Sequence, residues 1–376
     1  MASTKKCNGE HYGFKLKSIW SKAGIGTCSI FEYESSSFPS AKNFKVVFDL
    51  GSTPIFDETI SANHIVLSHG HLDHIGGIFS HARAHSLCSD SIPSYYIPEH
   101  LVEKIERARE VFSDIDSSCC ENNEICKDSK ARNYSWLQMN IVPVRAGEEI
   151  ELTQKKVKHG TQFFLRPFHV SHGGHPALGY TLVTKTSKDV LKQEYINLDG
   201  KAIGELAKSG VKVKETKVVE RIELCYSGDT NIHGLMPVGD VCDKQMSHSS
   251  SILFRNQGFR QAPLLLLELT YLDVNDSQLA QDRGHLNIVD VQNLLEYHGW
   301  VTNSVHDTKR TIVFYHISSK HKSVGTILDL MKKNLPCQIL QFAKVAVSAF
   351  GGKTLADIPF DTDGCVSLLD NMNLTT

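Results

Sequence analysis

The feature that most constrains this chain is a dense group of polar side chains directly behind an apolar strand. The segment 64–77 reads HIVLSHGHLDHIGG, and its apolar run at 64–68 has the composition of a buried strand. Four potential metal ligands follow within six positions: His69, His71, Asp73 and His74. Gly76 and Gly77 then allow the chain to turn tightly beside them. Because imidazole and carboxylate are good ligands for zinc and similar ions, the segment predicts a metal site.

Other predicted strands are followed by further potential ligands. Buried strands are predicted at 45–51, 161–170, 221–228, 263–272 and 310–317. In open α/β architectures the binding site lies at the carboxyl ends of the strands, so the polar residues found there should converge. These residues include His169, Asp229 and His316. An aspartate can bridge two ions through its two oxygens, so the set predicts a centre with two metals.

The choice of histidine within the segment HVSHGGHPALGY rests on its position. His169 directly ends the predicted strand, while His172 and His175 follow it by a few residues. All three compete for the same place in the site. His169 is preferred because it directly ends the strand.

The overall composition excludes some classes of protein. The 376 residues carry a formal net charge of −2, so the net charge does not indicate a nucleic-acid partner. Any basic surface that binds nucleic acid must be local. The N-terminal residues lack the apolar core of a signal peptide, and the longest apolar run, at 264–267, is too short to span a membrane. We therefore expect no membrane partner and a cytoplasmic or nuclear location.

The remaining pattern indicates helices, insertions and a polar tail. Residues 99–115 and 287–299 have apolar side chains at helical spacing. Residues 116–135 and 239–262 are interpreted as loop insertions. The polar tail at 352–376 is expected to be partly mobile.

The order and flanks of these motifs resemble the metallo-β-lactamase superfamily and, within it, ribonuclease Z in its short, plant-like form, the tRNA 3′-processing endonuclease. The segments FDLG, SHGHLDHIGG, FHV…GY, SGDT, LELTYLD…GHLNI and FYHISS follow one another in the family's order. The resemblance covers about residues 12–350, taken as a single catalytic domain. It implies an α/β fold of the metallo-β-lactamase type, an αββα sandwich with two facing mixed sheets and helices outside.

The resemblance also implies a set of site residues and cofactors. Two zinc ions are implied, with manganese as an alternative. One ion would be held by His69, His71, His169 and Asp229. The other would be held by Asp73, His74, Asp229 and His316. Glu268 and His285 occupy the places of the family's catalytic glutamate–histidine pair.

A lysine-rich segment separates this reading from others. Residues 184–217 contain eight lysines and five acidic residues and are similar to the substrate-gripping insertion, or exosite, of ribonuclease Z. Such a projection suits a phosphate backbone, whose contacts position the nucleic acid without reading its sequence. The expected RNA-binding residues are Lys188, Lys192, Lys201, Lys208, Lys212 and Lys320. The chain departs from the family's F-S-x-R-Y after the last zinc histidine, because Lys320 and His321 replace arginine and tyrosine.

The implied reaction is cleavage of the 3′ trailer from precursor tRNA. Two metals would lower the pKa of a shared water, and the resulting hydroxide would attack the scissile phosphodiester. Asp73 would orient or deprotonate that water, and His285, held by Glu268, would protonate the leaving oxygen. The tRNA would be recognised by its shape. The resemblance further implies a homodimer in which one subunit grips and the other cuts.

Two other readings compete with this one. A glyoxalase-like thioester or lactone hydrolase would also carry SHGHLDHIGG, but it has no evident use for the long lysine-rich interval between His169 and Asp229. A non-catalytic tRNA-binding paralogue is suggested by the altered sequence HISSKH at 316–321. Its difficulty is the full ligand set, which a binding module does not need.

Overall fold

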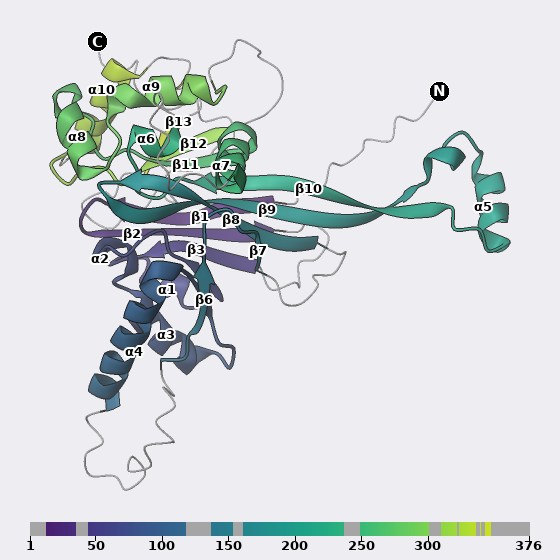
Figure 1. Ribbon diagram of the computed structural model, residues 1–376, viewed down its shortest axis with the longest axis horizontal. Helices are drawn as coiled ribbons and strands as arrows, with labels where there is room; N and C mark the ends of the chain where they lie inside the picture. The colour runs from purple at the N-terminus through teal and green to yellow at the C-terminus, as the bar shows by residue number, and fades with distance from the viewer. Residues whose placement is uncertain are drawn as a thin grey trace, which may run out of the picture.

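The protein consists of two facing mixed sheets with helices on their outer sides (Figure 1). The computed structural model describes residues 13–34, 44–117, 137–152, 161–236, 249–300, 310–321, 323–335, 339 and 343–346. The predicted tail at 352–376 and most of the predicted insertion at 116–135 lie outside these residues. Within them, the predicted αββα sandwich of two facing mixed sheets with helices outside is confirmed.

The first sheet is antiparallel at one side and parallel at the other. Its order is β1-β2-β3-β4-β5-β6, with β1 to β3 antiparallel and β3 to β6 parallel. The strands are β1 (Gly13–Lys22), β2 (Gly26–Glu34), β3 (Phe44–Leu50), β4 (His64–Val66), β5 (Ser94–Pro98) and β6 (Asn140–Val144). The predicted strands at 45–51 and 64–68 are β3 and β4, whose apolar runs are buried because the sheet is covered on both faces.

The second sheet also combines both strand directions. Its order is β13-β12-β11-β10-β9-β8-β7, antiparallel from β7 to β10 and parallel from β10 to β13. The strands are β7 (Ile150–Glu151), β8 (Thr161–His172), β9 (His175–Leu191), β10 (Lys214–Tyr226), β11 (Leu264–Glu268), β12 (Thr311–Tyr315) and β13 (Ala343–Val345). The strands predicted at 161–170, 221–228, 263–272 and 310–317 correspond to β8, the end of β10, β11 and β12.

Helices cover the outer face of each sheet. On the first sheet lie α1 (Phe56–Thr59), α2 (Leu72–Ile75), α3 (Ile78–Cys88), the 3-10 helix η1 (Glu99–Leu101) and α4 (Val102–Ser117). On the second lie α6 (Ile232–Leu235), α7 (Ser249–Gln261), η6 (Val274–Asp276), α8 (Ser277–Arg283), α9 (Ile288–Tyr297) and α10 (Val324–Asn334). Between the sheets, side chains of both form a separate apolar core that includes Phe48 and Tyr226.

The interpretation of 239–262 as a loop insertion is wrong for residues 249–261, which form α7. Phe259 of this helix is buried in the core under the second sheet. Gly258 allows the close approach, because a Cβ there would lie 2.2 Å from Oγ1 of Thr181 on β9. The preceding serines and the polar residues within the helix conceal this packing in the sequence.

A long arm projects from the second sheet (Figure 1). The outer parts of β9 and β10 form a two-stranded ribbon that carries η4 (Gln193–Tyr195) and α5 (Gly200–Lys208) at its far end. Asp199 caps α5 by accepting a hydrogen bond from the Ala202 amide at 2.8 Å. At the base, Arg166 of β8 donates two hydrogen bonds of 2.7 Å to Glu220 of β10. The segment 184–217 lies in this arm, and it consists of a regular two-stranded ribbon with a helix.

Candidate metal centre

The loop after β4 and the short helix α2 carry the four potential ligands of the first motif. His69 and His71 lie in the loop, whereas Asp73 and His74 lie in α2. His74 is fully buried, and the side chain of Asp73 is 14% exposed at the edge of the site. The end of β3 packs tightly against α2, because a Cβ on Gly51 would lie 1.9 Å from the carbonyl oxygen of Asp73. The motif is therefore held against the first sheet.

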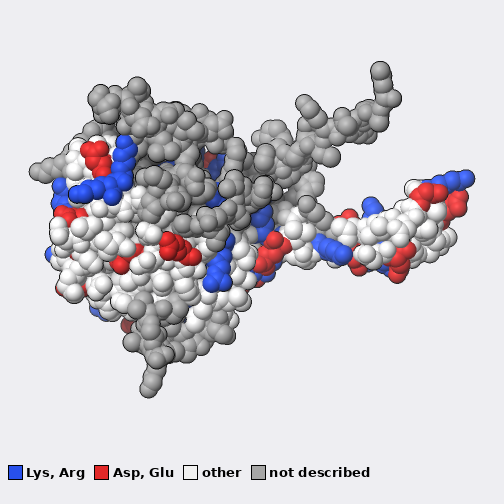
Figure 2. Space-filling model, turned by 90° about the horizontal axis from the view of Figure 1, so that it is seen from above, with Lys and Arg blue, Asp and Glu red and all other residues white. Residues whose placement is uncertain are grey.

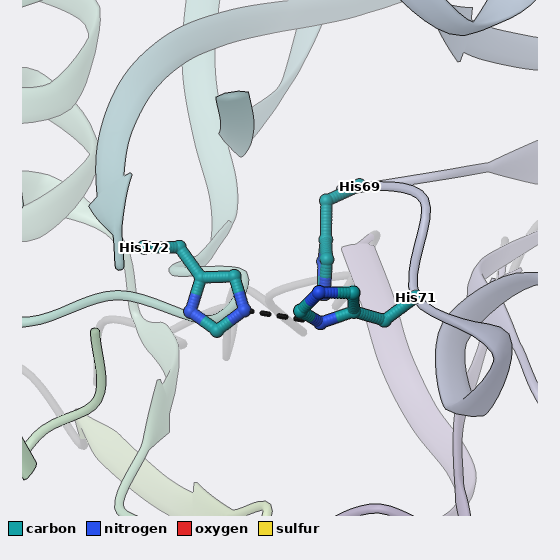
Figure 3. A group of neighbouring side chains, drawn as sticks. All are labelled: His69, His71 and His172. Carbon is teal, nitrogen blue, oxygen red and sulfur yellow. Dashed lines mark hydrogen bonds between the residues drawn. The ribbon is translucent and has the colours of Figure 1, made fainter. Parts of the chain in front are cut away.

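Three histidines from two sheets form one cluster (Figure 3). Nε2 of His172, at the end of β8, lies 3.2 Å from Nδ1 of His71. The ring of His69 is centred 4.6 Å from that of His71 and 4.8 Å from that of His172. Three imidazoles with ligand atoms so close together form a potential metal site.

A second cluster lies beside the first, and Asp229 is placed between them. Oδ2 of Asp229 lies 3.2 Å from Nε2 of His74 and 3.3 Å from Nε2 of His316. It also lies 3.9 Å from Nε2 of His69 in the first cluster. Asp73 approaches from the rim, with Oδ2 at 3.4 Å from Nε2 of His316. A carboxylate in this position can serve two ions at once.

The residues present fit a divalent metal. Oδ1 of Asp229 and Nε2 of His69 are buried, and within the described part of the chain neither has a hydrogen-bond partner. A buried polar atom without a partner is costly, and a metal ion would satisfy both atoms. The donor set of imidazole and carboxylate suits zinc or a similar divalent ion.

The structure brings His172, and not the preferred His169, to the ligand cluster. The two residues are three positions apart on a strand with regular register, so their side chains point to opposite faces. His172 is fixed in place because its Nδ1 lies 2.9 Å from the carbonyl oxygen of Gly284. The choice of His169 is therefore corrected. The third candidate, His175, is exposed, with its ring centred 5.0 Å from that of His71.

The carboxylates of the site are held in the charged form. Burial opposes ionisation of Asp229, but the nearby His316 and His74 outweigh it and hold the pKa of Asp229 well below its ordinary value. Burial likewise opposes ionisation of Asp73, and a hydrogen bond from His316 with the charge of His74 lowers its pKa to about 2. Both residues can therefore act as anionic ligands.

Three imidazoles of the site have a lowered pKa, which favours the neutral form that metal binding requires. Burial lowers the pKa of His172 to about 4 and lowers the pKa of His69 well below its ordinary value. Burial and the neighbouring His175 also lower the pKa of His71. His74 differs: burial opposes its charged form, but the carboxylates of Asp229 and Asp49 raise its pKa well above the ordinary value. The position of His74 thus attracts positive charge, whether a proton or a metal.

The predicted pair Glu268 and His285 lies next to the metal clusters. Nδ1 of His285 is 2.9 Å from Oε1 of Glu268, which also accepts a hydrogen bond from the Leu286 amide at 3.0 Å. Burial lowers the pKa of His285, but the attraction of Glu268 and of Asp229 outweighs it and raises the pKa above its ordinary value. A histidine held in this way can carry a proton.

Asp49 contacts the proposed metal centre, although the sequence analysis did not single it out. It lies one residue before the end of β3, is fully buried, and its Oδ2 lies 2.8 Å from Nδ1 of His74. It also has a positive φ of 54°, as does His316 with 63°, which is rare for residues other than glycine. Strained residues of this kind concentrate at functional sites. The available sign in the sequence was a charged residue at the end of the apolar run 45–51.

The lysines proposed to bind RNA fall in two places. Lys201, Lys208 and Lys212 are exposed on the arm, where basic and acidic side chains are interspersed (Figure 2). Lys192 is half-buried and lies 3.7 Å from Glu194, and the side chain of Lys188 lies outside what the structure describes. Lys320 forms an ion pair with Asp276 of η6. None of the described helices has the length and apolar character needed to cross a membrane.

Comparison with known proteins identifies several relatives. No protein-family model matches the chain. It is 26% identical over 278 residues to the chloroplastic tRNase Z TRZ2 of Arabidopsis thaliana, a match covering 74% of this chain and 63% of that protein. It is 29% identical over 286 residues to tRNase Z TRZ1 of Arabidopsis thaliana, covering 76% of this chain and 81% of TRZ1. The chain is a homologue of the tRNase Z proteins.

Two further similarities define how far this homology extends. A nuclear ribonuclease Z of Triticum aestivum is 29% identical over 204 residues, covering 54% of this chain and 93% of that protein. Among solved structures, unliganded yeast PDE1 superposes with a TM-score of 0.52 at 13% identity, covering 90% of this chain and 98% of that chain. At this identity the similarity concerns the fold alone. The chain spans less than two thirds of the length of TRZ2.

Proposed function

We propose that this tRNase Z homologue is a zinc-dependent endonuclease that cleaves the 3′ trailer from precursor tRNA. The observation that carries the proposal is the pair of ligand clusters that meet at Asp229. Relatives named tRNase Z and ribonuclease Z support the choice of substrate. The projecting arm supports a large substrate over a small ester, because it extends on the opposite side of the molecule from α2, which carries Asp73 and His74 (Figure 1).

The proposed centre holds two zinc ions, with manganese as an alternative. His69, His71, His172 and Asp229 would hold one ion. Asp73, His74, Asp229 and His316 would hold the other. When bound, such ions lower the pKa of water towards about 7 and neutralise charge that develops on a phosphate.

The remaining site residues have separate roles in the proposal. Asp73 lies at the rim, where its carboxylate can orient the attacking water. Glu268 accepts the hydrogen bond from Nδ1 of His285, so Nε2 of His285 is the atom that can pass a proton to the leaving oxygen. Lys320 can neutralise phosphate only if its ion pair with Asp276 opens.

The proposal extends to binding, assembly and location. Residues 12–350 would form one catalytic domain whose arm, within 184–217, holds the folded tRNA by its phosphates. A homodimer would let the arm of one subunit hold the tRNA that the other subunit cuts. We propose a cytoplasmic or nuclear location, noting that one relative is named nuclear and another chloroplastic.

The test is incubation of the zinc-loaded protein with a precursor tRNA that carries a 3′ trailer. A His74→Ala variant, which removes a ligand, and a His100→Ala variant, which changes an exposed histidine of η1, are assayed alongside. A single cut at the trailer junction by the wild type and His100→Ala, but not by His74→Ala, is expected.

Two other results would replace the proposal. Tight binding of tRNA without cleavage would indicate the non-catalytic paralogue. Neither binding nor cleavage would favour a thioester or lactone hydrolase, to be assayed on those substrates.

A further inference from the structure

We propose that Ser68 and Thr270 are positioning residues, each of which links a buried carboxylate to a metal-binding histidine through its hydroxyl group. The inference rests on the proposed metal centre, but not on tRNA as its substrate. One hydroxyl group follows β4 of the first sheet and the other follows β11 of the second sheet. In each link the order is the same: carboxylate, hydroxyl group, histidine.

The first link runs from Asp49 through Ser68 to His69. Oγ of Ser68 donates to Oδ2 of Asp49 at 2.8 Å and lies 2.9 Å from Nδ1 of His69. A hydroxyl group has one proton, so when it donates to the carboxylate it can only accept from the ring. Nδ1 of His69 must then carry the ring proton, so Nε2 is unprotonated and has a free lone pair. That Nε2 is the buried atom for which the described residues provide no hydrogen-bond partner.

The second link runs from Glu268 through Thr270 to His316. Oγ1 of Thr270 donates to Oε2 of Glu268 at 3.1 Å and lies 2.9 Å from Nδ1 of His316. The same proton count makes Nδ1 of His316 the donor and leaves its Nε2 as a lone pair. That Nε2 lies 3.3 Å from Oδ2 of Asp229, where a metal is proposed.

Each carboxylate therefore orients two histidines. Asp49 holds His74 directly, with 2.8 Å between Oδ2 and Nδ1, and holds His69 through Ser68. Glu268 holds His285 directly and His316 through Thr270. Three of the four histidines, His69, His74 and His316, are predicted ligands with Nε2 facing Asp229.

The physical role follows from the two tautomers of imidazole. A neutral histidine can carry its proton on either nitrogen, and only the bare nitrogen binds a metal. The hydroxyl groups select the tautomer with Nε2 bare and fix the ring orientation. Partners of this kind typically contribute about 10-fold to 100-fold in metal affinity.

The test compares variants that remove one hydroxyl group with matched controls. Ser68→Ala and Thr270→Val each break one link, and Thr270→Ser keeps the hydroxyl group. Tyr226→Phe removes a different donor to Asp49, the Tyr226 hydroxyl at 2.6 Å, without breaking a link to a histidine. Zinc affinity is measured by competition with a chelating dye, the two sites are distinguished by cadmium-113 NMR, and histidine tautomers are read by nitrogen-15 NMR.

The expected result is selective for each site. Ser68→Ala should lower the zinc affinity of the site that contains His69 by about 10-fold to 100-fold and disturb the His69 tautomer. Thr270→Val should have the same effect on the zinc affinity of the site that contains His316 and on the His316 tautomer. The zinc affinities of Thr270→Ser and Tyr226→Phe should stay within about twofold of that of the wild type, because both links from carboxylate to histidine are intact.

Specific outcomes would overturn the proposal. The proposal is wrong if Thr270→Val keeps the wild-type zinc affinity and histidine tautomers. It is also wrong if Tyr226→Phe loses as much zinc affinity as Ser68→Ala. The two Thr270 variants decide the matter alone if Ser68→Ala does not fold. None of these readouts uses RNA, so failure here is distinct from failure to cleave tRNA.

Discussion

Nε2 of His74 and Nε2 of His316 lie 3.3 Å apart, although the two residues are separated by 242 positions in the sequence. Nδ1 of His74 is engaged by Asp49 and Nδ1 of His316 by Thr270. If both Nδ1 atoms carry the proton, two lone pairs face each other beside the carboxylate of Asp229. A cation between the groups, either a proton or a metal ion, would relieve the repulsion between the lone pairs, and the neighbouring carboxylates of Asp229 and Asp73 fit a metal ion.

The Asp229→Asn variant should therefore lose metal. The amide keeps the size of the side chain but removes the charge that can serve both ions. We expect zinc affinity to fall by more than about 100-fold, since loss of a ligand exceeds the effect of its supporting partners. Zinc content after dialysis, measured by atomic emission, checks this expectation. The Asp290→Asn variant is a control on α9, and equal zinc loss in both would contradict the assignment.

Replacing His285 separates metal binding from proton transfer. His285→Ala should lower the rate of RNA cleavage by about 10²-fold to 10⁴-fold, because the leaving oxygen loses its proton donor. Bis(4-nitrophenyl) phosphate has a leaving group that departs without a proton, so its hydrolysis should be much less affected. The measurement is kcat for both substrates with zinc content held equal. A similar loss on both substrates would show that His285 is not the proton donor.

The sequence predicted most of the residues that the structure brings into the two clusters, because these residues follow apolar strands and the ends of parallel strands meet at one edge of a sheet. It failed at His169 because strand parity decides which side chain faces the site. The strand continues beyond its predicted end, to His172, so the residue that ends it changes. A pattern of apolar residues leaves strand ends uncertain by such a margin.

The supporting residues could not be predicted because their roles depend on contacts across the chain. Ser68 looks like an ordinary residue at a strand end, and only the fold brings its hydroxyl group to Asp49. Likewise α7 was hidden, because its burial depends on Gly258 and Phe259 meeting the second sheet and not on a regular apolar stripe. Local patterns thus identified the proposed ligands and missed the groups that lie hydrogen-bonded behind them.

The arm lysines should affect RNA binding and not the chemical step. Combined replacement of Lys201, Lys208 and Lys212 by alanine should raise KM for precursor tRNA and leave kcat nearly unchanged. The dependence of binding on salt should become shallower by about 0.7 to 0.9 for each phosphate that the arm no longer neutralises. Binding at several salt concentrations measures this slope.

The matched control for the arm replaces exposed lysines of the body. Lys104→Ala with Lys333→Ala removes charge from α4 and α10, away from the arm. These variants should keep the wild-type KM and salt dependence. A fall in kcat with unchanged KM in the arm variant would argue against a binding role.

Acid should destabilise the fold through histidines remote from the metal centre, of which His81 is the clearest. Its Nε2 donates to the carbonyl oxygen of Thr59 at 3.0 Å, and its Nδ1 lies 2.6 Å from the hydroxyl of Tyr95. Burial lowers the pKa of His81 from 6.5 to about 4. The folded state therefore binds fewer protons than the unfolded state between these values. The contribution of His81 is fully present above pH 6.5 and is lost as the pH falls towards 4.

The His81→Gln variant tests this linkage, because glutamine can still donate to Thr59 but does not titrate. The wild type should lose on the order of 3 kcal/mol more unfolding free energy than the variant between neutral pH and pH 4. Urea denaturation of both proteins across this range, under the same metal conditions, gives the difference, so that effects of the metal ligands cancel. The same loss in both proteins would mean that His81 does not remain neutral in the folded state, and the acid sensitivity would then belong to other groups.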